Sequence, residues 1–233
     1  MKSMIKCEEY KLYKDKQIRI IVGFIIFYLT IKFIFSEKPS FYVSGSVGEW
    51  MADATIDSAF MAMLVSLVAS AIFAAEYSYK TYKNIIPYVK KRRLFEAKIV
   101  TNAVSIFIIL IIWYIFGLII AIIKSTNSLT FQDLLFSLYK FCTQYLMILA
   151  HSGLLILISV VFHSRTITNI STVLLWFCYS FIPINGKKIF DYIVYACIWG
   201  TKPNYMLCLC LLLLFCICTF ISNIIFNKQE VRA

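Results

Sequence analysis

The stretch at residues 75–98 reads AEYSYKTYKNIIPYVKKRRLFEAK and interrupts a series of long apolar runs with a dense group of cations. The chain of 233 residues is 61% hydrophobic and only 15% charged, which is far too apolar for a soluble domain of this size. The sequence therefore predicts an all-α integral membrane protein in which this stretch is a loop between two spans.

Several apolar runs are long enough to cross a hydrocarbon core of roughly 30 Å as helices. We expect six spans: Ile18–Phe35, Ile56–Ala75, Ile99–Ile123, Phe141–Phe162, Thr166–Pro183 and Tyr205–Phe226. No internal repeat and no Gly/Ser/Pro-rich linker divides the chain, so residues 1–233 are expected to form one membrane domain. Its main segments outside the spans are expected at residues 1–17, 76–98 and 184–204.

The cations predict the orientation, because Lys and Arg are retained on the cytoplasmic side of a membrane. Six lie before or at the start of the first span, seven lie in or beside the loop after the second span, and Arg165, Lys228 and Arg232 follow later spans. Both termini are therefore predicted to be cytoplasmic, and the segment 76–98 with them.

The net charge of +11 does not indicate nucleic-acid binding, because the cations flank apolar spans and no basic recognition domain surrounds them. Anionic lipid of the inner leaflet is the expected partner of these side chains.

Metal and nucleotide chemistry are not indicated for this chain. Cys208, Cys210, Cys216 and Cys218 lie within the apolar run MLCLCLLLLFCICTF, where cysteine behaves as a small apolar residue. Two thiols in a helical C-x-C pattern lie about 200° apart, whereas zinc ligands must converge on the ion. The cysteine spacing therefore predicts no metal site. No phosphate-binding loop motif occurs either, so this chain is not expected to bind a nucleotide cofactor, and no catalytic residue is predicted.

The cytoplasmic loop permits two interpretations. Its aromatic and aliphatic side chains are suited to insertion into the groove of a partner protein, and Pro87 would end or kink a short helix there. The same residues are also typical of a basic anchor with interfacial tyrosines.

This loop and its flanks resemble the membrane subunits of type-2 ABC exporters, above all the small permeases of lantibiotic-immunity and antimicrobial-peptide export systems. In that family a span ends in the pattern F-x-x-E. After it come T-x-K-N, an apolar turn and a pair of basic residues, and a Lys begins the next span. The matching residues here are Phe73, Glu76, Thr81, Lys83, Asn84, Arg92, Arg93 and Lys98. The segment EEYKLYKDK is similar to the family's membrane-surface elbow helix, with Glu8 or Glu9 at its acidic position.

The resemblance implies that a short helix between Tyr77 and Tyr88 couples the permease to a separate ATPase, with Glu76 at the hinge. The implied coupling residues are Glu76, Tyr77, Tyr79, Thr81, Tyr82, Lys83, Asn84, Ile85, Ile86 and Tyr88. ATP and Mg²⁺ would bind to a dimer of that ATPase, and a second copy of this chain or a homologous permease would complete the pore. The resemblance further implies export of amphipathic peptides or hydrophobic compounds from a bacterial cell membrane.

Three further features are candidates for substrate contact or gating. Glu49, Asp53 and Asp57 recur every four residues in the first outer loop, either as a solvated helix face or as a surface that attracts cationic peptides. Gln144 and His151 lie within the fourth span, where polar groups serve either interhelical hydrogen bonds or a transport pathway. Residues 184–204 are expected to form a short re-entrant or external helix, with an interfacial loop as the alternative.

Two other classes of function stay open on the sequence. An intramembrane cysteine peptidase would need a thiolate beside a histidine, and Cys142 with His151 or Cys178 with His163 are the available pairs. A structural membrane anchor would share the basic loops but would need no ATPase.

Overall fold

The computed structural model describes residues 2–35, 59–75, 90–124, 131–181, 183–184, 187–188 and 205–228. Seven helices occupy nearly all of these residues: α1 (Lys2–Lys14), α2 (Lys16–Phe35), α4 (Ala59–Phe73), α7 (Lys91–Lys124), α8 (Phe131–Phe162), α9 (Arg165–Phe181) and α11 (Tyr205–Lys228). The prediction of an all-helical architecture is confirmed for this part of the chain, apart from one short pair of strands.

Three of the described helices contain stretches that are long and apolar enough to cross a membrane: Lys91–Ile119 in α7, Phe141–Phe162 in α8, and α11. The three other expected spans correspond to α2, α4 and α9, which have 20, 15 and 17 residues. The chain is therefore built as a membrane protein, and the six-span topology stays a prediction.

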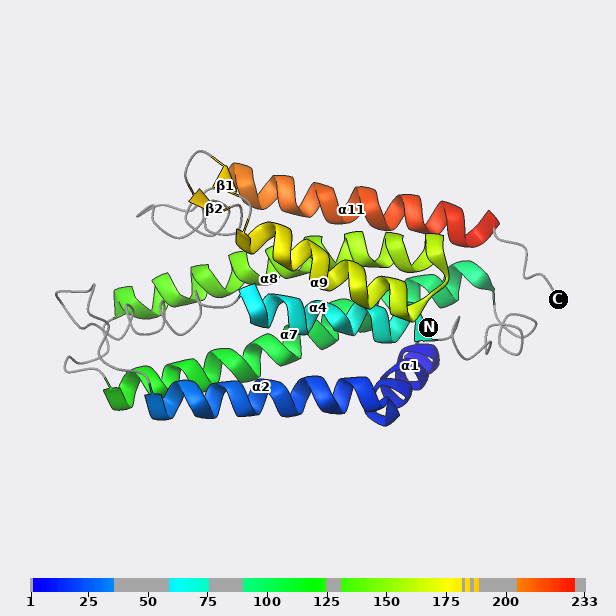
Figure 1. Cartoon of the computed structure of the whole chain (residues 1–233). Helices are drawn as coiled ribbons and strands as arrows, with labels where there is room; N and C mark the ends of the chain where they lie inside the picture. Colours follow the sequence, from blue (N-terminus) through cyan, green and yellow to red (C-terminus); the bar gives the residue numbers. More distant parts are fainter. Residues whose placement is uncertain are drawn as a thin grey trace.

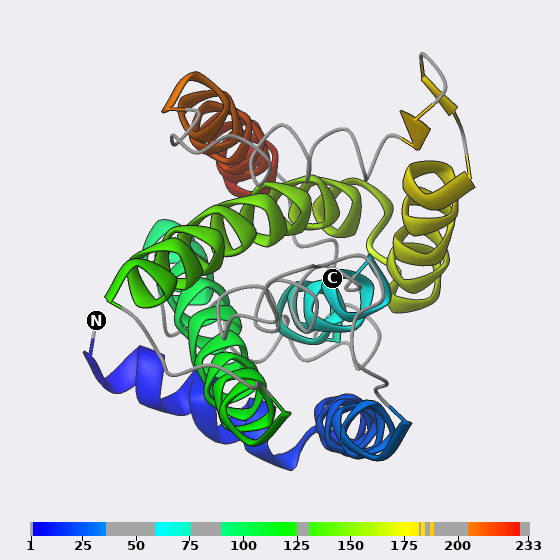
Figure 2. The same cartoon turned by 90° about the vertical axis from the view of Figure 1, so that its left-hand side faces the viewer.

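All the long helices run along one axis, with α4 in the interior of the bundle (Figure 1). Helix α4 packs against α2, α7, α8 and α9, which surround it in the view down the bundle (Figure 2), and α11 packs on the outside of α8. Side chains from Leu64 to Ala75 are buried apart from that of Leu67, and many of them are Ala or Ser. Small residues of this kind allow close helix packing inside a membrane.

One end of the bundle collects the segments that the cation pattern assigns to a single side of the membrane. Helix α1, the last turn of α4, the first turns of α7, the α8–α9 connection and the end of α11 all lie there (Figure 1), and we call it the α1 end. Helix α1 lies at a steep angle to α2 and packs on α7, α2 and α4.

Helix α7 begins at Lys91, eight residues before the expected start of the third span. The reason is that residues 91–98 already have a buried face, formed by Leu94, Phe95 and Ala97, while Arg92 and Arg93 are exposed. Residues 91–98, which we expected to lie in the cytoplasmic segment 76–98 outside the spans, are therefore part of a long continuous helix.

The segment expected as an external helix at 184–204 begins differently. Strands β1 (Pro183–Ile184) and β2 (Lys187–Lys188) pair in antiparallel register, with Ile184 opposite Lys187. The sequence Asn185-Gly186 between them is typical of two-residue hairpins, a signal that the helical interpretation overlooked. Residues 189–204 lie outside the described part of the chain.

Candidate functional site

A buried ion pair joins α1 to α7 at the α1 end of the bundle. Lys98 Nζ donates to Glu8 Oε2 at 3.0 Å, and the side chains of Lys98 and Glu8 are 0% and 5% exposed. The other carboxylate oxygen of Glu8 accepts a bond of 2.6 Å from Lys11 Nζ on the same helix. Because unpaired buried charges are strongly unfavourable, this geometry holds both partners in place.

Lys98 also contacts α4. Its Nζ donates to the backbone carbonyl of Ile72 at 2.7 Å and lies 5.9 Å from the centre of the Phe73 ring. The carbonyls of the last helical turn lack partners within the helix, and a cation there is favourable to the helix dipole. Lys98 therefore connects the end of α4, the start of α7 and α1 through a single ammonium group.

This arrangement lies at both flanks of residues 76–89, which join α4 to α7. The rings of Phe73 and Phe95 pack edge to face with centroids 5.5 Å apart, and Phe95 in turn packs against Phe226 of α11 at 5.3 Å. The residues on both sides of the connecting segment are thus part of one packed aromatic and ionic assembly.

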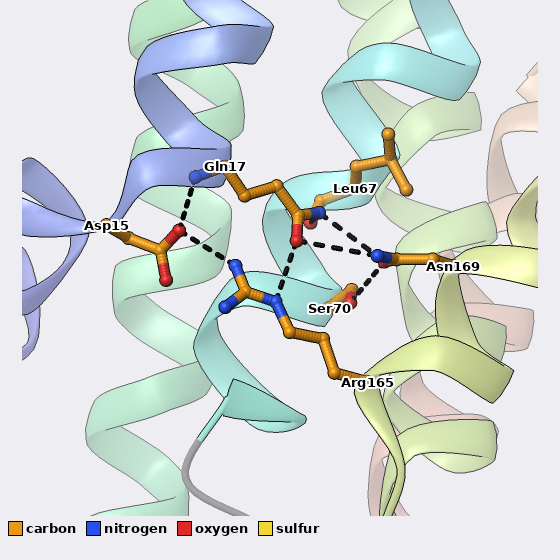
Figure 3. Close-up of polar contacts among 6 residues, drawn as sticks. All are labelled: Asp15, Gln17, Leu67, Ser70, Arg165 and Asn169. Atoms are coloured by element: carbon orange, nitrogen blue, oxygen red, sulfur yellow. Dashed lines mark hydrogen bonds and ion pairs between the residues drawn. The ribbon is translucent and has the colours of Figure 1, made fainter. Parts of the chain in front are cut away.

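A second polar arrangement, which we call the α2–α9 cluster, joins the start of α2 to the start of α9 (Figure 3). Asp15 precedes α2 and caps it, because its Oδ1 accepts a bond of 2.7 Å from the Gln17 backbone N–H. The same oxygen accepts a bond of 2.8 Å from Arg165 Nη2 at the start of α9. Arg165 Nε donates to Gln17 Oε1 at 2.7 Å, so the guanidinium group contacts two residues at the start of α2.

Asn169, one turn further along α9, extends the α2–α9 cluster to α4. Its Oδ1 accepts a bond of 2.6 Å from Ser70 Oγ, and Gln17 Nε2 lies 3.4 Å from both this oxygen and the Leu67 carbonyl (Figure 3). The α2–α9 cluster thus consists of Asp15, Gln17, Ser70, Arg165, Asn169 and the carbonyl of Leu67.

The short connection between α8 and α9 positions Arg165. His163 has a φ of 53°, a left-handed conformation common just after a helix, and its N–H donates to the Ser159 carbonyl at 3.0 Å. Ser164 then caps α9 by accepting a bond of 3.3 Å from the Ile167 N–H. This tight reversal places the first residue of α9 directly against the start of α2.

None of the ten expected coupling residues lies in the described part of the chain, since they occupy positions 76–88; the acidic stripe of Glu49, Asp53 and Asp57 also lies outside it. Gln144 and His151 are half-buried on α8, seven residues and therefore two turns apart on one side of the helix. The polar contacts described above do not connect them to the α2–α9 cluster or to Glu8 and Lys98.

The candidate thiol–histidine pairs are separated by the fold. Cys142 and His151 lie on the same uninterrupted helix, nine residues or about 13.5 Å apart along its axis. His163 precedes α9 and Cys178 lies near its far end, which separates them by about 20 Å. Within the described ranges, no group of three His, Cys, Asp or Glu side chains is placed to hold a metal ion.

Sequence reasoning identified only part of these arrangements. The family resemblance pointed to Lys98 and to either Glu8 or Glu9. The structure distinguishes the two acids, because Glu8 is buried and Glu9 is exposed. The α2–α9 cluster was missed. Its signals were an Asp followed two residues later by Gln at a helix start, and a single Arg in the short connection between two apolar runs.

A comparison with protein families matches residues 4–183 to the family described as ABC-2 family transporter protein. No curated protein matches the chain. The matched region covers more than half of the chain and includes α1 from residue 4 onward, both flanks of residues 76–89 and the whole α2–α9 cluster. The chain therefore belongs to the ABC-2 transporter family, as a membrane-spanning permease subunit whose family membership implies an ABC ATPase as partner.

Proposed function

We propose that this chain is the permease of an ATP-driven exporter that moves amphipathic peptides or hydrophobic compounds across or out of a bacterial cell membrane. ATP and Mg²⁺ bind to a separate pair of ATPase subunits, and a second copy of this chain or a related permease completes the pathway. No catalytic step is assigned to this chain.

The observation that carries the proposal is the contact of Lys98 with both Glu8 and the Ile72 carbonyl. It braces the two helix ends from which residues 76–89 depart, so a force applied to that segment acts on α4, α7 and α1 together. The segment from Tyr77 to Tyr88 is the proposed coupling helix, seated in a groove of the ATPase. Closure of the ATPase dimer then moves α4 and α7 relative to their neighbours.

The α1 end is proposed to face the cytoplasm. Exposed cations gather there, as expected for the side that retains positive charge; they are Lys6, Lys14, Lys16, Arg19, Lys90, Arg92, Arg93 and Lys228. Cys7 gives a direct test, because it is exposed on α1. In intact cells a membrane-impermeant maleimide should leave Cys7 unlabelled, and in inverted vesicles it should label it, with Cys7→Ser as the control. Labelling of Cys7 in intact cells would reverse the proposed orientation.

For the cargo, we propose that Gln144 and His151 line the pathway and that Glu49, Asp53 and Asp57 attract cationic peptides on the outer side. Expression of the chain with its ATPase should raise the resistance of a sensitive bacterium to membrane-active cationic peptides. Unchanged resistance to such peptides, with active ATP hydrolysis, would exclude this class of cargo.

The partner proposal is tested by gentle isolation of the tagged full chain from its native membrane, followed by mass spectrometry. We expect a stoichiometric ATPase in the preparation, lost when the sequence from Tyr77 to Tyr88 is scrambled. The matched control scrambles residues 36–47 of the first outer loop over the same length, and it should retain the ATPase. A clean preparation without any ATPase would contradict the proposal and favour a structural anchor.

A further inference from the structure

The α2–α9 cluster joins two helices that are not primary packing neighbours. Helix α2 packs on α1, α4 and α7, whereas α9 packs on α4 and α8. In the view down the bundle α2 and α9 lie on neighbouring sides of α4 (Figure 2). At the α1 end, Arg165 and Asn169 reach across this separation with their side chains to contact Asp15 and Gln17 (Figure 3).

The chemistry of the α2–α9 cluster differs from that of the buried pair of Glu8 and Lys98. Arg165 and Asp15 retain 15% and 11% of their side-chain exposure, whereas Lys98 has none. Water at the rim is able to replace the bonds of a partly exposed pair when it opens, whereas a fully buried pair would leave charges stranded in an apolar interior. The two arrangements are thus suited to different tasks, one to release and the other to permanent bracing.

The α2–α9 cluster is also connected to the part of α4 that leads into residues 76–89. Ser70 Oγ contacts Asn169, and Ser70 lies one turn before the end of α4 at Phe73. A shift of this turn along or around its axis would pull the hydroxyl from the Asn169 oxygen and disturb the Gln17 amide that lies between Asn169 and Leu67.

We propose that the α2–α9 cluster is a releasable closure, which holds the α1 ends of α2 and α9 together beside α4 and opens when the end of α4 moves. Opening exposes the face of α4 between these helices at this end only. The movement of α4 that opens the closure rests on the proposed coupling function. The closure itself is a property of this chain and is measurable without the ATPase.

The test measures distances between spin labels on the full chain in lipid nanodiscs. The labels are attached to unnatural ketone-bearing residues, so that the native cysteines stay in place. One pair replaces Ile20 and Ile170, which are 59% and 53% exposed near the α1 end. A second pair replaces Ile31 and Phe177, exposed residues at the opposite ends of the same helices.

Arg165→Gln removes the charge that spans Asp15 and Gln17. Because a hydrogen bond to a charged group shifts an equilibrium by about tenfold or more, we expect the population with a longer Ile20–Ile170 distance to rise by at least about tenfold. The Ile31–Phe177 distance should stay unchanged. Asp15→Asn is the second variant, because Asn still caps α2 while the ion pair is lost; it should shift the same population in the same direction.

The matched control is Arg92→Gln, which removes an equal charge at the same end. It breaks only an exposed contact, that between Arg92 and Glu96. It should leave both distances unchanged. Native distances in folded Arg165→Gln and Asp15→Asn proteins would overturn the closure, and so would equal widening at both ends of the helices. If these variants widen the α1 end but no ATPase copurifies with the chain, the closure stands and the coupling function fails.

Discussion

Glu8 and Lys98 lie 90 positions apart in the sequence, yet their charged groups meet at 3.0 Å with almost no exposure to solvent. The neighbouring acid Glu9 is exposed. The pair therefore defines which face of α1 packs on the bundle.

Glu8→Gln should destabilise the fold strongly. The ammonium of Lys98 would remain buried without its counter-charge, at an expected cost of about 3–5 kcal/mol. Glu9→Gln makes the same chemical change at an exposed site and should alter stability by less than about 0.5 kcal/mol. Thermal unfolding in mild detergent measures both variants, and equal midpoints would contradict the assigned role of Glu8.

The double variant Glu8→Leu/Lys98→Met should recover most of the stability lost in Glu8→Gln, because replacing both buried charges with apolar groups is often close to neutral. Transport should not recover with it if the ionic contact between α1 and α7 carries force. Stability and transport that recover together would show that packing alone is sufficient.

Gly153 determines how closely α8 and α11 approach. A Cβ at this position would lie 3.1 Å from Phe215 Cδ2 and 3.3 Å from Phe215 Cα. Gly153→Ala should therefore cost about 1–3 kcal/mol, since the α11 backbone has to move. A Cβ at Gly23 on α2 would meet no atom within 4 Å, so Gly23→Ala should be neutral or stabilise by up to about 1 kcal/mol. Resistance to unfolding by sodium dodecyl sulfate distinguishes the two.

Asn102 is buried between α7 and α8 with only part of its hydrogen-bonding capacity used. Its Nδ2 donates to Ser152 Oγ at 3.0 Å, whereas its Oδ1 has no hydrogen-bond partner among the residues that the structure describes. Asn102→Leu should change stability by less than about 1 kcal/mol, because an unsatisfied buried carbonyl is removed together with the bond. Ser152 keeps its own bond to the Leu149 carbonyl.

Ser152→Ala is the informative partner of this variant. It leaves the Asn102 amide without its acceptor and should cost about 1–3 kcal/mol, more than Asn102→Leu. A larger loss of stability in Asn102→Leu than in Ser152→Ala would contradict this expectation. It would show that the hydrogen bond between Asn102 and Ser152 contributes more than the burial of the Asn102 amide costs.

Replacement of Glu76, Thr81 or Asn84 should leave membrane insertion intact and uncouple ATP hydrolysis from transport, since these residues lie in the proposed coupling segment. Reconstituted vesicles with the ATPase allow both rates to be measured on one sample. While hydrolysis continues, we expect transport to fall by about tenfold or more for Glu76, because a hydrogen bond to a charged group contributes about 1.5–3 kcal/mol, and by a smaller factor for the uncharged Thr81 and Asn84. Normal transport in all three variants would count against the coupling assignment.

The acidic stripe of Glu49, Asp53 and Asp57 should matter most at low ionic strength. Neutralising all three residues should weaken transport of a cationic peptide at about 10 mM salt and have little effect near 1 M, where the Debye length falls from about 30 Å to about 3 Å. Equal transport by the native and neutralised chains at low salt would show that the stripe is only a solvated face.

The sequence by itself determined the membrane class, the helical architecture and the segments that share the α1 end. These follow from apolar length and from the positions of cations, which are local properties of the chain. The ends of helices were harder to predict, because α7 begins at Lys91 where Leu94 and Phe95 pack against the core. The pairing of β1 with β2 depended on a turn signal that a hydropathy pattern does not contain.

Only the tertiary structure decided between Glu8 and Glu9, and only it revealed the α2–α9 cluster. Arg165 and Asp15 are 150 positions apart, and each alone resembles an ordinary flanking charge. Their contact depends on the two-residue reversal before α9, on the cap of α2 and on the packing of both helices against α4. A hydrogen bond or ion pair requires its two groups within about 3 Å, a condition set by the packing of distant segments and not by the pattern around either residue.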